Sequence, residues 1–412
     1  MKDRSNQWVR NATLFLGGQA ISLFGSALVQ YAIMWKITLD TQSGLLMTLY
    51  IICGFVPTFL LSPFAGVWAD RYNRKMLIIV ADSLIALATL VLAILFFNGY
   101  REMWLFFVIA AVRAVGTGIQ TPAVGAVLPQ IVPQEHLTRV NGANGSIQAL
   151  VTLVSPMVSA ALVTMATMEA IFLIDVLTAL IAIGILVFWL RIPAHQKAST
   201  EQEGVGYLQD LMLGFRYIRN HRFLMQFFVF MAIFFVMAAP AAFLTPLQVT
   251  RSFGDDVWRL TAIEIAFSIG MMLGGGLIAA WGGFRNKMHT VILGAVTLGL
   301  FTVGLGLVPN FWIYIAFMAV VGVAMPVYST PATVLLQEKV EGDYLGRVFG
   351  VMGMISTSMM PFGMLIFGPI ADYVAIEWLL IGTGLFMAVA GLTMFRSRTL
   401  IDAGRPVESE PS

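Results

Sequence analysis

Four ionisable side chains lie inside long apolar stretches of the sequence: Asp82, Arg113, Asp175 and Glu264. A charge at the centre of a membrane helix costs at least ~2.5–3.5 kcal/mol on insertion scales, so residues of this kind are functional candidates. A carboxyl group takes up a proton readily in apolar surroundings and releases it beside a cation, whereas an arginine stays charged. These residue types predict proton binding. The three acids are candidate carriers, and Arg113 would control Asp175 if their helices face each other.

The alternative role of these four residues is structural, because a charge pair also holds neighbouring helices together. We favour this role for Asp82, which lies close to a charged loop. Both roles stay open for Glu264, which lies close enough to one end of its apolar stretch to reach the lipid headgroups. For Arg113 and Asp175 we favour the functional role.

Other kinds of chemistry lack their residue patterns in this sequence. The four histidines are far apart, and there is no H-E-x-x-H metal motif, no G-x-x-x-x-G-K-[ST] phosphate loop and no G-x-S-x-G nucleophile motif. The single cysteine, Cys53, can form no disulfide within the chain, and we interpret it as a packing residue. We therefore expect no enzyme, no metal and no cofactor, and any uphill work must use an ion gradient.

The elements that position these residues are membrane-spanning helices. The chain is 58% hydrophobic and only 11% charged, whereas a soluble domain is about 25% charged. A spanning helix needs about 20 apolar residues, and an unbroken apolar run excludes the alternating pattern of a barrel strand. Twelve such runs are predicted to span: 12–37, 44–69, 76–98, 104–129, 141–164, 168–190, 223–249, 259–281, 289–308, 311–336, 347–371 and 378–396.

Twelve spans place both ends of the chain on one side of the membrane, and the basic residues indicate which side. Only Arg101, Arg251 and Arg259 lie in one set of connections. Most of the 24 Lys and Arg residues lie in the other set and near the termini. The positive-inside rule then predicts a multi-pass protein of the plasma membrane with both termini in the cytoplasm.

The chain divides into two related halves. The sequence TPA occurs at 121–123 and again at 330–332, and LTRVNG at 137–142 matches LGRVFG at 345–350, at nearly the same offset. We predict an all-α membrane protein of two pseudo-symmetric six-helix bundles, 1–190 and 223–398, followed by a flexible tail at 399–412. The linker at 191–222 contains apolar residues at helical spacing, which favours an amphipathic helix on the inner membrane face over a plain connection.

The stretch GVWADRYNRK, residues 66–75, joins the second and third spans and carries a dense group of charges. Its residues Gly66, Asp70, Arg71, Arg74 and Lys75 resemble the signature loop of the major facilitator superfamily. Asn73 stands where a glycine is usual, and this departure is tolerable because asparagine also accepts a left-handed turn. Further segments are similar to the macrolide-efflux and siderophore-exporter branch: GGQAISLFGSALVQYAI, VRAVGTGIQTPAVGAVLPQIVP, FLIDVLTALIA and GFRYIRNHRFL. The resemblance covers about residues 10–395.

This resemblance implies a transporter that works by alternating access. It implies that Asp70 forms a latch with the start of the eleventh span, closing the inner side; the alternative is that the loop only anchors the chain. It also implies that the first, fourth, seventh and tenth spans line a cavity. The candidate substrate-binding residues on those spans are Gln19, Gln30, Tyr31, Thr117, Gln120, Met231, Phe234, Phe235, Met325 and Tyr328.

Methionine and aromatic side chains form an adaptable apolar wall, which suits an amphipathic compound better than a sugar or a phosphate. The leading hypothesis is an exporter of macrolide-like or multidrug-like compounds by proton antiport, in a bacterial-type membrane and as a monomer, with no nucleic acid as partner. The alternatives are an exporter of a siderophore or other natural product, and a carrier of lipids or other solutes. In place of the glycine-rich Gly-Pro motif that antiporters of the superfamily have in the fifth span, this chain has small residues and few glycines: Gly142, Ser155-Pro156 and Ser159-Ala160.

Overall fold

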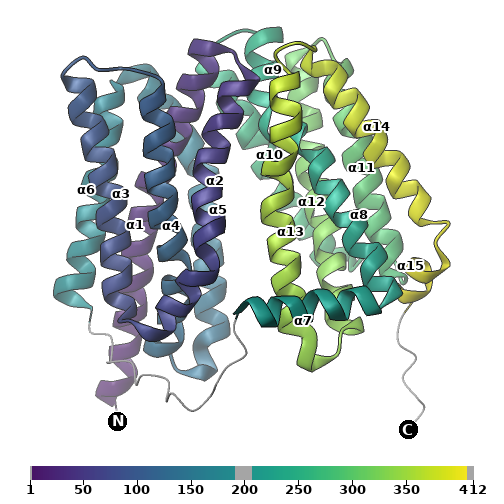
Figure 1. Cartoon of the computed structure of the whole chain (residues 1–412), viewed down its shortest axis with the longest axis horizontal. Coiled ribbons are helices and arrows are strands. Elements are labelled where there is room, and N and C mark those ends of the chain that lie inside the picture. The colour runs from purple at the N-terminus through teal and green to yellow at the C-terminus, as the bar shows by residue number, and fades with distance from the viewer. Residues whose placement is uncertain (1, 191–206, 406–412) are drawn as a thin grey trace. The chain divides into compact units, whose positions relative to one another are not determined.

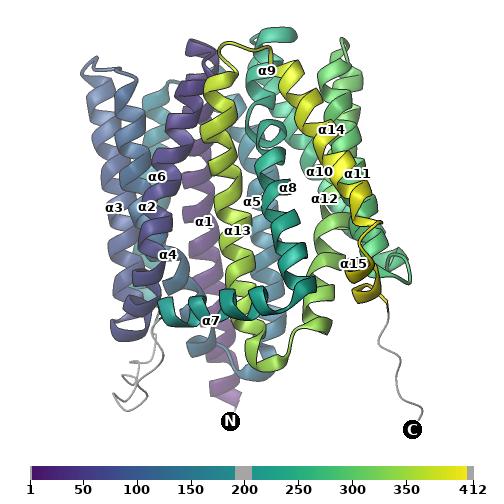
Figure 2. The same cartoon turned by 45° about the vertical axis from the view of Figure 1, so that its right-hand side comes forward.

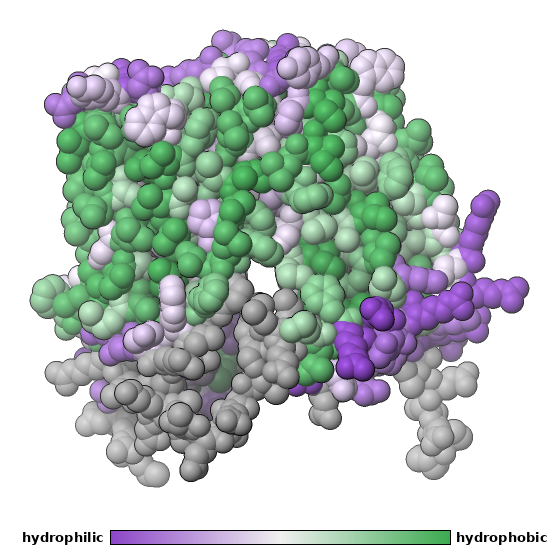
Figure 3. Space-filling model, in the orientation of Figure 1, coloured by the Kyte–Doolittle hydropathy of each residue, from purple (hydrophilic) through white to green (hydrophobic). Residues whose placement is uncertain are grey.

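The computed structural model describes residues 2–190 and 207–405 and, within them, contains helices and no strands. Twelve of its helical segments are long and apolar enough to cross a membrane, which confirms the predicted number of spans. On the face drawn in Figure 3, hydrophobic residues cover most of the described surface, and hydrophilic residues gather at the ends of the helices. This distribution is that of a protein whose helix sides face lipid.

The helices follow one another with short connections, so each predicted span can be compared with an observed helix. The bounds are α1 Lys2–Thr41, α2 Gly44–Arg71, α3 Arg74–Phe97, α4 Trp104–Ile131, η1 Gln134–His136, α5 Leu137–Met165, α6 Met168–Gly184, η2 Ile185–Trp189, α7 Tyr207–Asn220, α8 Arg222–Phe243, α9 Thr245–Ser252, α10 Val257–Trp281, α11 Lys287–Leu307, α12 Phe311–Lys339, α13 Gly342–Ile370, α14 Ile376–Met394 and α15 Arg398–Ala403.

Two of these helices differ from the predicted segments. The seventh span, predicted as one run over 223–249, is divided at Leu244 into α8 and α9, because Pro246 begins a new helix there. Part of the tail predicted at 399–412 is helical: α15 begins at the N-cap Ser397, whose hydroxyl accepts the Leu400 amide. The Asn286 side chain binds the carbonyl of Ile401 and holds α15 in place. Residues 406–412 lie outside the described part.

The chain forms two compact units, one of residues 1–40 and 49–204 and the other of residues 41–48 and 205–412. Within the first unit, α3 packs against α4 and α6, and this arrangement places the intramembrane acids (Figure 1). Within the second unit, α10 packs against α12, α11 against α12 and α14, and α13 against α8. The short segment 41–48 contains the start of α2 and groups with the second unit, although the rest of α2 belongs to the first.

The repeat seen in the sequence corresponds to matching helices in the two units. The two TPA motifs lie inside α4 and α12, and each gives its helix an internal proline, Pro122 and Pro331. Likewise α5 and α13 are both 29 residues long, and each has a proline, Pro156 or Pro361, in its second half. The agreement supports duplication of a six-helix unit.

The amphipathic helix predicted in the linker is α7. It lies across the ends of α8 and α13 of its own unit (Figures 1 and 2). Tyr217 stacks on Tyr344 with ring centroids 4.3 Å apart, and Gly214 lies so close to the Arg347 backbone that a side chain would not fit. Met212 and Phe215 on another side are exposed, as expected of a face in contact with lipid. Residues 191–206 of the linker lie outside the described part.

Candidate functional site

The predicted pair of Arg113 and Asp175 is brought together in the interior of the first unit. Arg113 Nη1 lies 2.5 Å from Asp175 Oδ2, and the two side chains are only 13% and 1% exposed. Thr89 of α3 donates its hydroxyl to Asp175 Oδ2 at 2.9 Å, and Ser26 of α1 donates to Asp175 Oδ1 at 3.2 Å. Arg113 also donates to Thr89 Oγ1 and, at 3.2 Å, to the carbonyl of Ser26. Four helices thus meet at one buried ion pair.

Asp82 lies in the same unit with a different set of partners. Its Oδ1 accepts a hydrogen bond of 2.5 Å from Gln120 Nε2 and lies 3.5 Å from the hydroxyl of Ser22. The side chain is buried, and its Oδ2 has no hydrogen-bond partner among the described residues. No cation pairs with Asp82 in that part of the chain. Burying an ionised carboxylate without a cation costs free energy, so Asp82 differs chemically from Asp175, which is paired with Arg113.

The two acids belong to one polar path through the first unit. Ser22 and Ser26 are one helical turn apart on α1, Asp82 and Thr89 lie two turns apart on α3, and Arg113 and Gln120 lie two turns apart on α4. On α1 and on α4, one residue of the pair contacts Asp82 and the other contacts Asp175. On α3, Thr89 donates to Asp175. The sequence analysis missed Ser22, Ser26 and Thr89; the signal that identifies them is hydroxyl residues at helical spacing within apolar spans.

Glu264 is separate from this path. It lies on α10 in the second unit and is half-buried, and it has no ion pair or hydrogen bond to the described residues. Of the four predicted proton-coupling residues, Glu264 thus belongs to the second unit and the other three belong to the first.

An apolar cavity inside the second unit contains three of the predicted substrate-binding residues. The space in it that a water-sized sphere can reach is about 70 Å³, which is smaller than the ~300–1,000 Å³ of common small-molecule sites. Phe234, Phe235 and Met325 line it, together with residues of α10, α11, α13 and α14. Tyr328 stacks on Phe234 with centroids 4.7 Å apart, and its buried hydroxyl has no partner among the described residues. Met231 is buried on α8 and does not line this cavity.

The predicted substrate-binding residues of the first unit are more scattered. Gln120 is buried and bound to Asp82, and Gln19 is also buried. Gln30 and Thr117 are exposed, and Tyr31 lies beside Trp35 with centroids 5.7 Å apart. Gln120 thus belongs to the polar path in this structure, while substrate binding by the other four residues stays a prediction.

The charged loop at 66–75 has a clear local role within the first unit. Arg74 donates to the carbonyls of Ala69 at 2.8 Å and Ala126 at 2.7 Å, near the ends of α2 and α4. Lys75 Nζ donates to the carbonyl of Leu190 at 2.9 Å, just after η2. Cations at helix C-termini complete the unpaired carbonyls and oppose the helix dipole. These two residues therefore join three helix ends.

Two expectations for this loop can be compared with the structure. Asn73 does not adopt a left-handed turn: its φ is −66°, and its side chain caps α3 by accepting the amides of Lys75 and Met76. A left-handed turn is not needed here, because an asparagine N-cap satisfies the free amides of a new helix with ordinary backbone angles. The side chains of Asp70 and Arg71 lie outside the described residues, so the latch of Asp70 stays a prediction. An added side-chain carbon at Gly66 would meet open space.

Replacement of Arg74 by alanine is expected to destabilise the first unit by about 1.5–3 kcal/mol, because the carbonyls of Ala69 and Ala126 lose a charged hydrogen-bond donor. The measurement is the midpoint of thermal unfolding of the detergent-solubilised protein. Arg139→Ala is the matched control, since Arg139 is an exposed arginine of the same unit with no ion pair or hydrogen bond in the described part. Equal midpoints for the two variants would contradict a structural role for Arg74.

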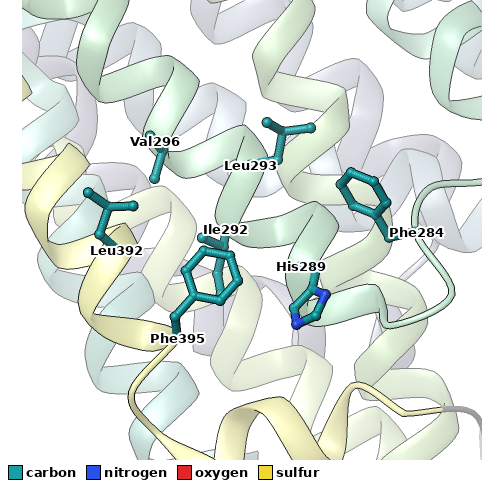
Figure 4. A pocket seen from close by; sticks show the side chains of 7 residues that line it. All are labelled: Phe284, His289, Ile292, Leu293, Val296, Leu392 and Phe395. Carbon is teal, nitrogen blue, oxygen red and sulfur yellow. The ribbon is translucent and has the colours of Figure 1, made fainter.

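Another cavity, at the ends of α11 and α14, is drawn in Figure 4. Six apolar side chains and His289 line it, and the His289 ring lies 5.4 Å from that of Phe395. The described residues contain no cluster of His, Cys, Asp and Glu that could hold a metal ion. Cys53 has a free thiol.

Twelve spanning helices in two matching units, with buried acids and an apolar cavity, define a membrane transporter rather than an enzyme. Residues 13–364 match the family model of the Major Facilitator Superfamily, and the chain belongs to that family.

Two curated relatives are similar to the chain over nearly its whole length. It is 32% identical to macrolide efflux protein A of Streptococcus pyogenes over 94% of this chain and 96% of that protein. It is 23% identical to the multidrug efflux pump Tap of Mycobacterium bovis over 97% of this chain and 98% of that protein. Among solved structures, a variant of the nucleoside transporter NupG has the same fold, with a TM-score of 0.69 and 13% identity over 93% of this chain and 99% of that one.

Proposed function

We propose that the protein is a secondary active exporter of amphipathic compounds, driven by proton antiport through alternating access. The observation that carries the proposal is the cavity of the second unit, where Phe234, Phe235 and Met325 offer apolar side chains that can adapt to differently shaped ligands. Full-length similarity to a macrolide efflux protein and a multidrug efflux pump supports export as the direction of transport.

The proposed coupling ion is the proton. The sequence has no phosphate-loop motif, and the buried acids of the first unit offer groups that can exchange a proton during the transport cycle. The orientation proposed from the basic residues, with both ends in the cytoplasm, would let the proton enter as the compound leaves.

The test is the susceptibility of a drug-sensitive bacterium that produces the protein, measured across macrolides and other amphipathic compounds. We expect the minimum inhibitory concentration to rise several-fold for at least one amphipathic class. No change for any such compound would remove this proposal and favour a siderophore, a lipid or another solute as substrate.

Replacement of Phe235 by alanine is expected to lower resistance to the transported compounds at least several-fold, because an aromatic face is removed from the cavity wall. Phe230→Ala is the matched control: Phe230 lies on the same helix but lines a different groove, with Val229 and Ile233. Both variants must be present in the membrane at equal amounts. Equal resistance from the two variants would mean that this cavity does not bind the substrate.

A further inference from the structure

The segment between α1 and α2 is bound by a charged group within the second unit. Asp372 lies in the turn after α13, and its Oδ1 accepts the amide of Gly44 at 2.6 Å. Its Oδ2 accepts the amide of Leu45 at 3.1 Å and the hydroxyl of Ser43 at 2.9 Å. A carboxylate thus completes the free amides at the start of α2, where the helix dipole also favours a negative charge.

Arg251, near the end of α9, ties the same segment from another direction. Its Nη1 donates to the carbonyl of Ala371 at 2.6 Å, and its Nη2 lies 3.3 Å from Asp372 Oδ1 and donates to the carbonyl of Gln42. We call Ser43, Gly44, Leu45, Arg251 and Asp372 the clasp. Arg251 belongs to α9, which lies at the end of the second unit opposite α7 in Figure 1.

The backbones beneath the clasp are in close contact. A side chain on Gly44 would overlap the carbonyl of Gly368, and one on Gly368 would overlap Thr48. The hydroxyl of Thr48 lies 3.2 Å from the carbonyl of Met364, and its side chain is buried. The contact therefore extends one turn along α2 and α13.

Asp372 carries its charge in this arrangement. Partial burial acts to raise its pKa, but the amides of Gly44 and Leu45, the Ser43 hydroxyl and the Arg251 guanidinium together hold the pKa of Asp372 below its usual range. Charge-assisted hydrogen bonds of this kind are about twice as strong as neutral ones.

The position of the clasp in the chain suggests what it controls. The chain enters the first unit on both sides of the held segment, through α1 up to Asp40 and through α2 from Leu49. At the clasp, the second unit holds a piece of chain that leads directly into the first unit. In a transporter that rocks its halves around a central site, such a connection joins two parts that move relative to each other.

We propose that Asp372 and Arg251 are gating residues: the clasp holds the start of α2 against the second unit in one state and must release it once in each transport cycle. The proposal rests on the alternating-access transport of the proposed function. Because the clasp and the polar path of the first unit share no residue, its gating role can be tested separately from proton binding.

The first experiment measures opening without any substrate. Thr48→Cys in a Cys53→Ser background places a single thiol beneath the clasp, and its labelling rate by a water-soluble maleimide is recorded in membranes. Adding Asp372→Asn is expected to raise the labelling rate about ten-fold. Loss of the charge weakens the hydrogen bonds that hold the start of α2, and this raises the population of the open state by about that factor. Adding Glu377→Gln is the control, since Glu377 accepts a hydrogen bond of 2.6 Å from Ser252 beside Arg251 and does not contact α2. Equal rates for the two additions would overturn the proposal.

The second experiment tests whether the clasp must open for transport. Ser43→Cys with Asp372→Cys in the Cys53→Ser background is oxidised to a disulfide across the clasp, and accumulation of an ethidium-type cationic dye in inverted vesicles is measured. Oxidation is expected to stop transport, and a reductant is expected to restore it. The control pair Ser252→Cys with Glu377→Cys links α9 to α14 at the same end and should transport in both states.

Undiminished transport by the oxidised clasp pair would show a permanent structural contact and overturn the gating role. If the reduced pair also transports no dye while the control pair does, the crosslink is not the cause of the loss, and the labelling rates of the first experiment decide whether the clasp opens. If the control pair also fails with every dye, the proposed function is wrong, and the labelling rates alone decide whether the clasp opens.

Discussion

Replacement of Asp175 by asparagine is expected to abolish accumulation of substrate against its gradient while leaving substrate binding intact. Asparagine keeps the shape of the side chain, and its single carbonyl oxygen can accept from either Ser26 or Thr89, but it cannot carry a proton. The measurement is uptake driven by a pH gradient in inverted vesicles, with binding followed separately by fluorescence of the same compound.

The same substitution leaves Arg113 without its anion. Arg113 is only 13% exposed, and breaking a buried ion pair by removing one partner costs about 3–5 kcal/mol. We therefore expect less folded Asp175→Asn protein in the membrane, and transport must be expressed per folded molecule. Arg113→Ala should disturb both binding and transport, because the arginine also donates to Thr89 and to the carbonyl of Ser26.

A double variant separates the coupling role of this pair from a purely structural one. Arg113→Gln with Asp175→Asn removes both charges and keeps two polar side chains, so most of the lost stability should return. If the pair only holds α4 and α6 together through α3, transport should return with it. We expect stability without gradient-driven transport, and full recovery of accumulation would contradict Asp175 as a proton carrier.

Much of the fold follows from the sequence because the bilayer imposes strong constraints. A backbone in lipid must satisfy its own hydrogen bonds, so twelve apolar runs could only be helices. The pairing of Arg113 with Asp175 could be proposed for a similar reason, since an unpaired charge inside the membrane costs free energy and two opposite charges at similar depth can offset that cost by pairing. What the apolar runs could not show is which face of each helix meets which neighbour, because lipid-facing and buried residues are equally apolar.

The parts of the site that the sequence did not indicate are those made by small polar groups and by turns. Ser22 and Ser26 are common residue types whose role appears only when α1 is placed beside α3 and α6. Arg251 was interpreted from sequence as one of a few basic residues in a connection, and Asp372 had no distinguishing neighbours. Their contact joins residues more than a hundred positions apart in a chain for which only local patterns could be interpreted.

Asp82 is the acid for which the structure gives the sharpest chemical contrast with Asp175. Its carboxyl group is buried, holds a single short hydrogen bond from Gln120 and has one oxygen without a partner among the described residues. A proton on that oxygen would remove an unpaired buried charge. In the structural role favoured from sequence, Asp82 would only join α3 to α4. Any side chain that accepts the hydrogen bond of the Gln120 amide would then keep the two helices together.

Replacement of Asp82 by asparagine is therefore expected to leave the protein folded and to reduce pH-gradient-driven accumulation at least ten-fold. The asparagine carbonyl can still accept from Gln120, and no cation loses its partner, so the cost in stability stays near the ~1–3 kcal/mol of an unsatisfied buried amide. Ser22→Ala is the matched control, since it removes only the weak 3.5 Å contact and keeps the acid. Both are measured in the same inverted vesicles as Asp175→Asn. If Asp82→Asn accumulates substrate as well as Ser22→Ala does, Asp82 is a structural residue, and the proton is carried by Asp175 or by Glu264.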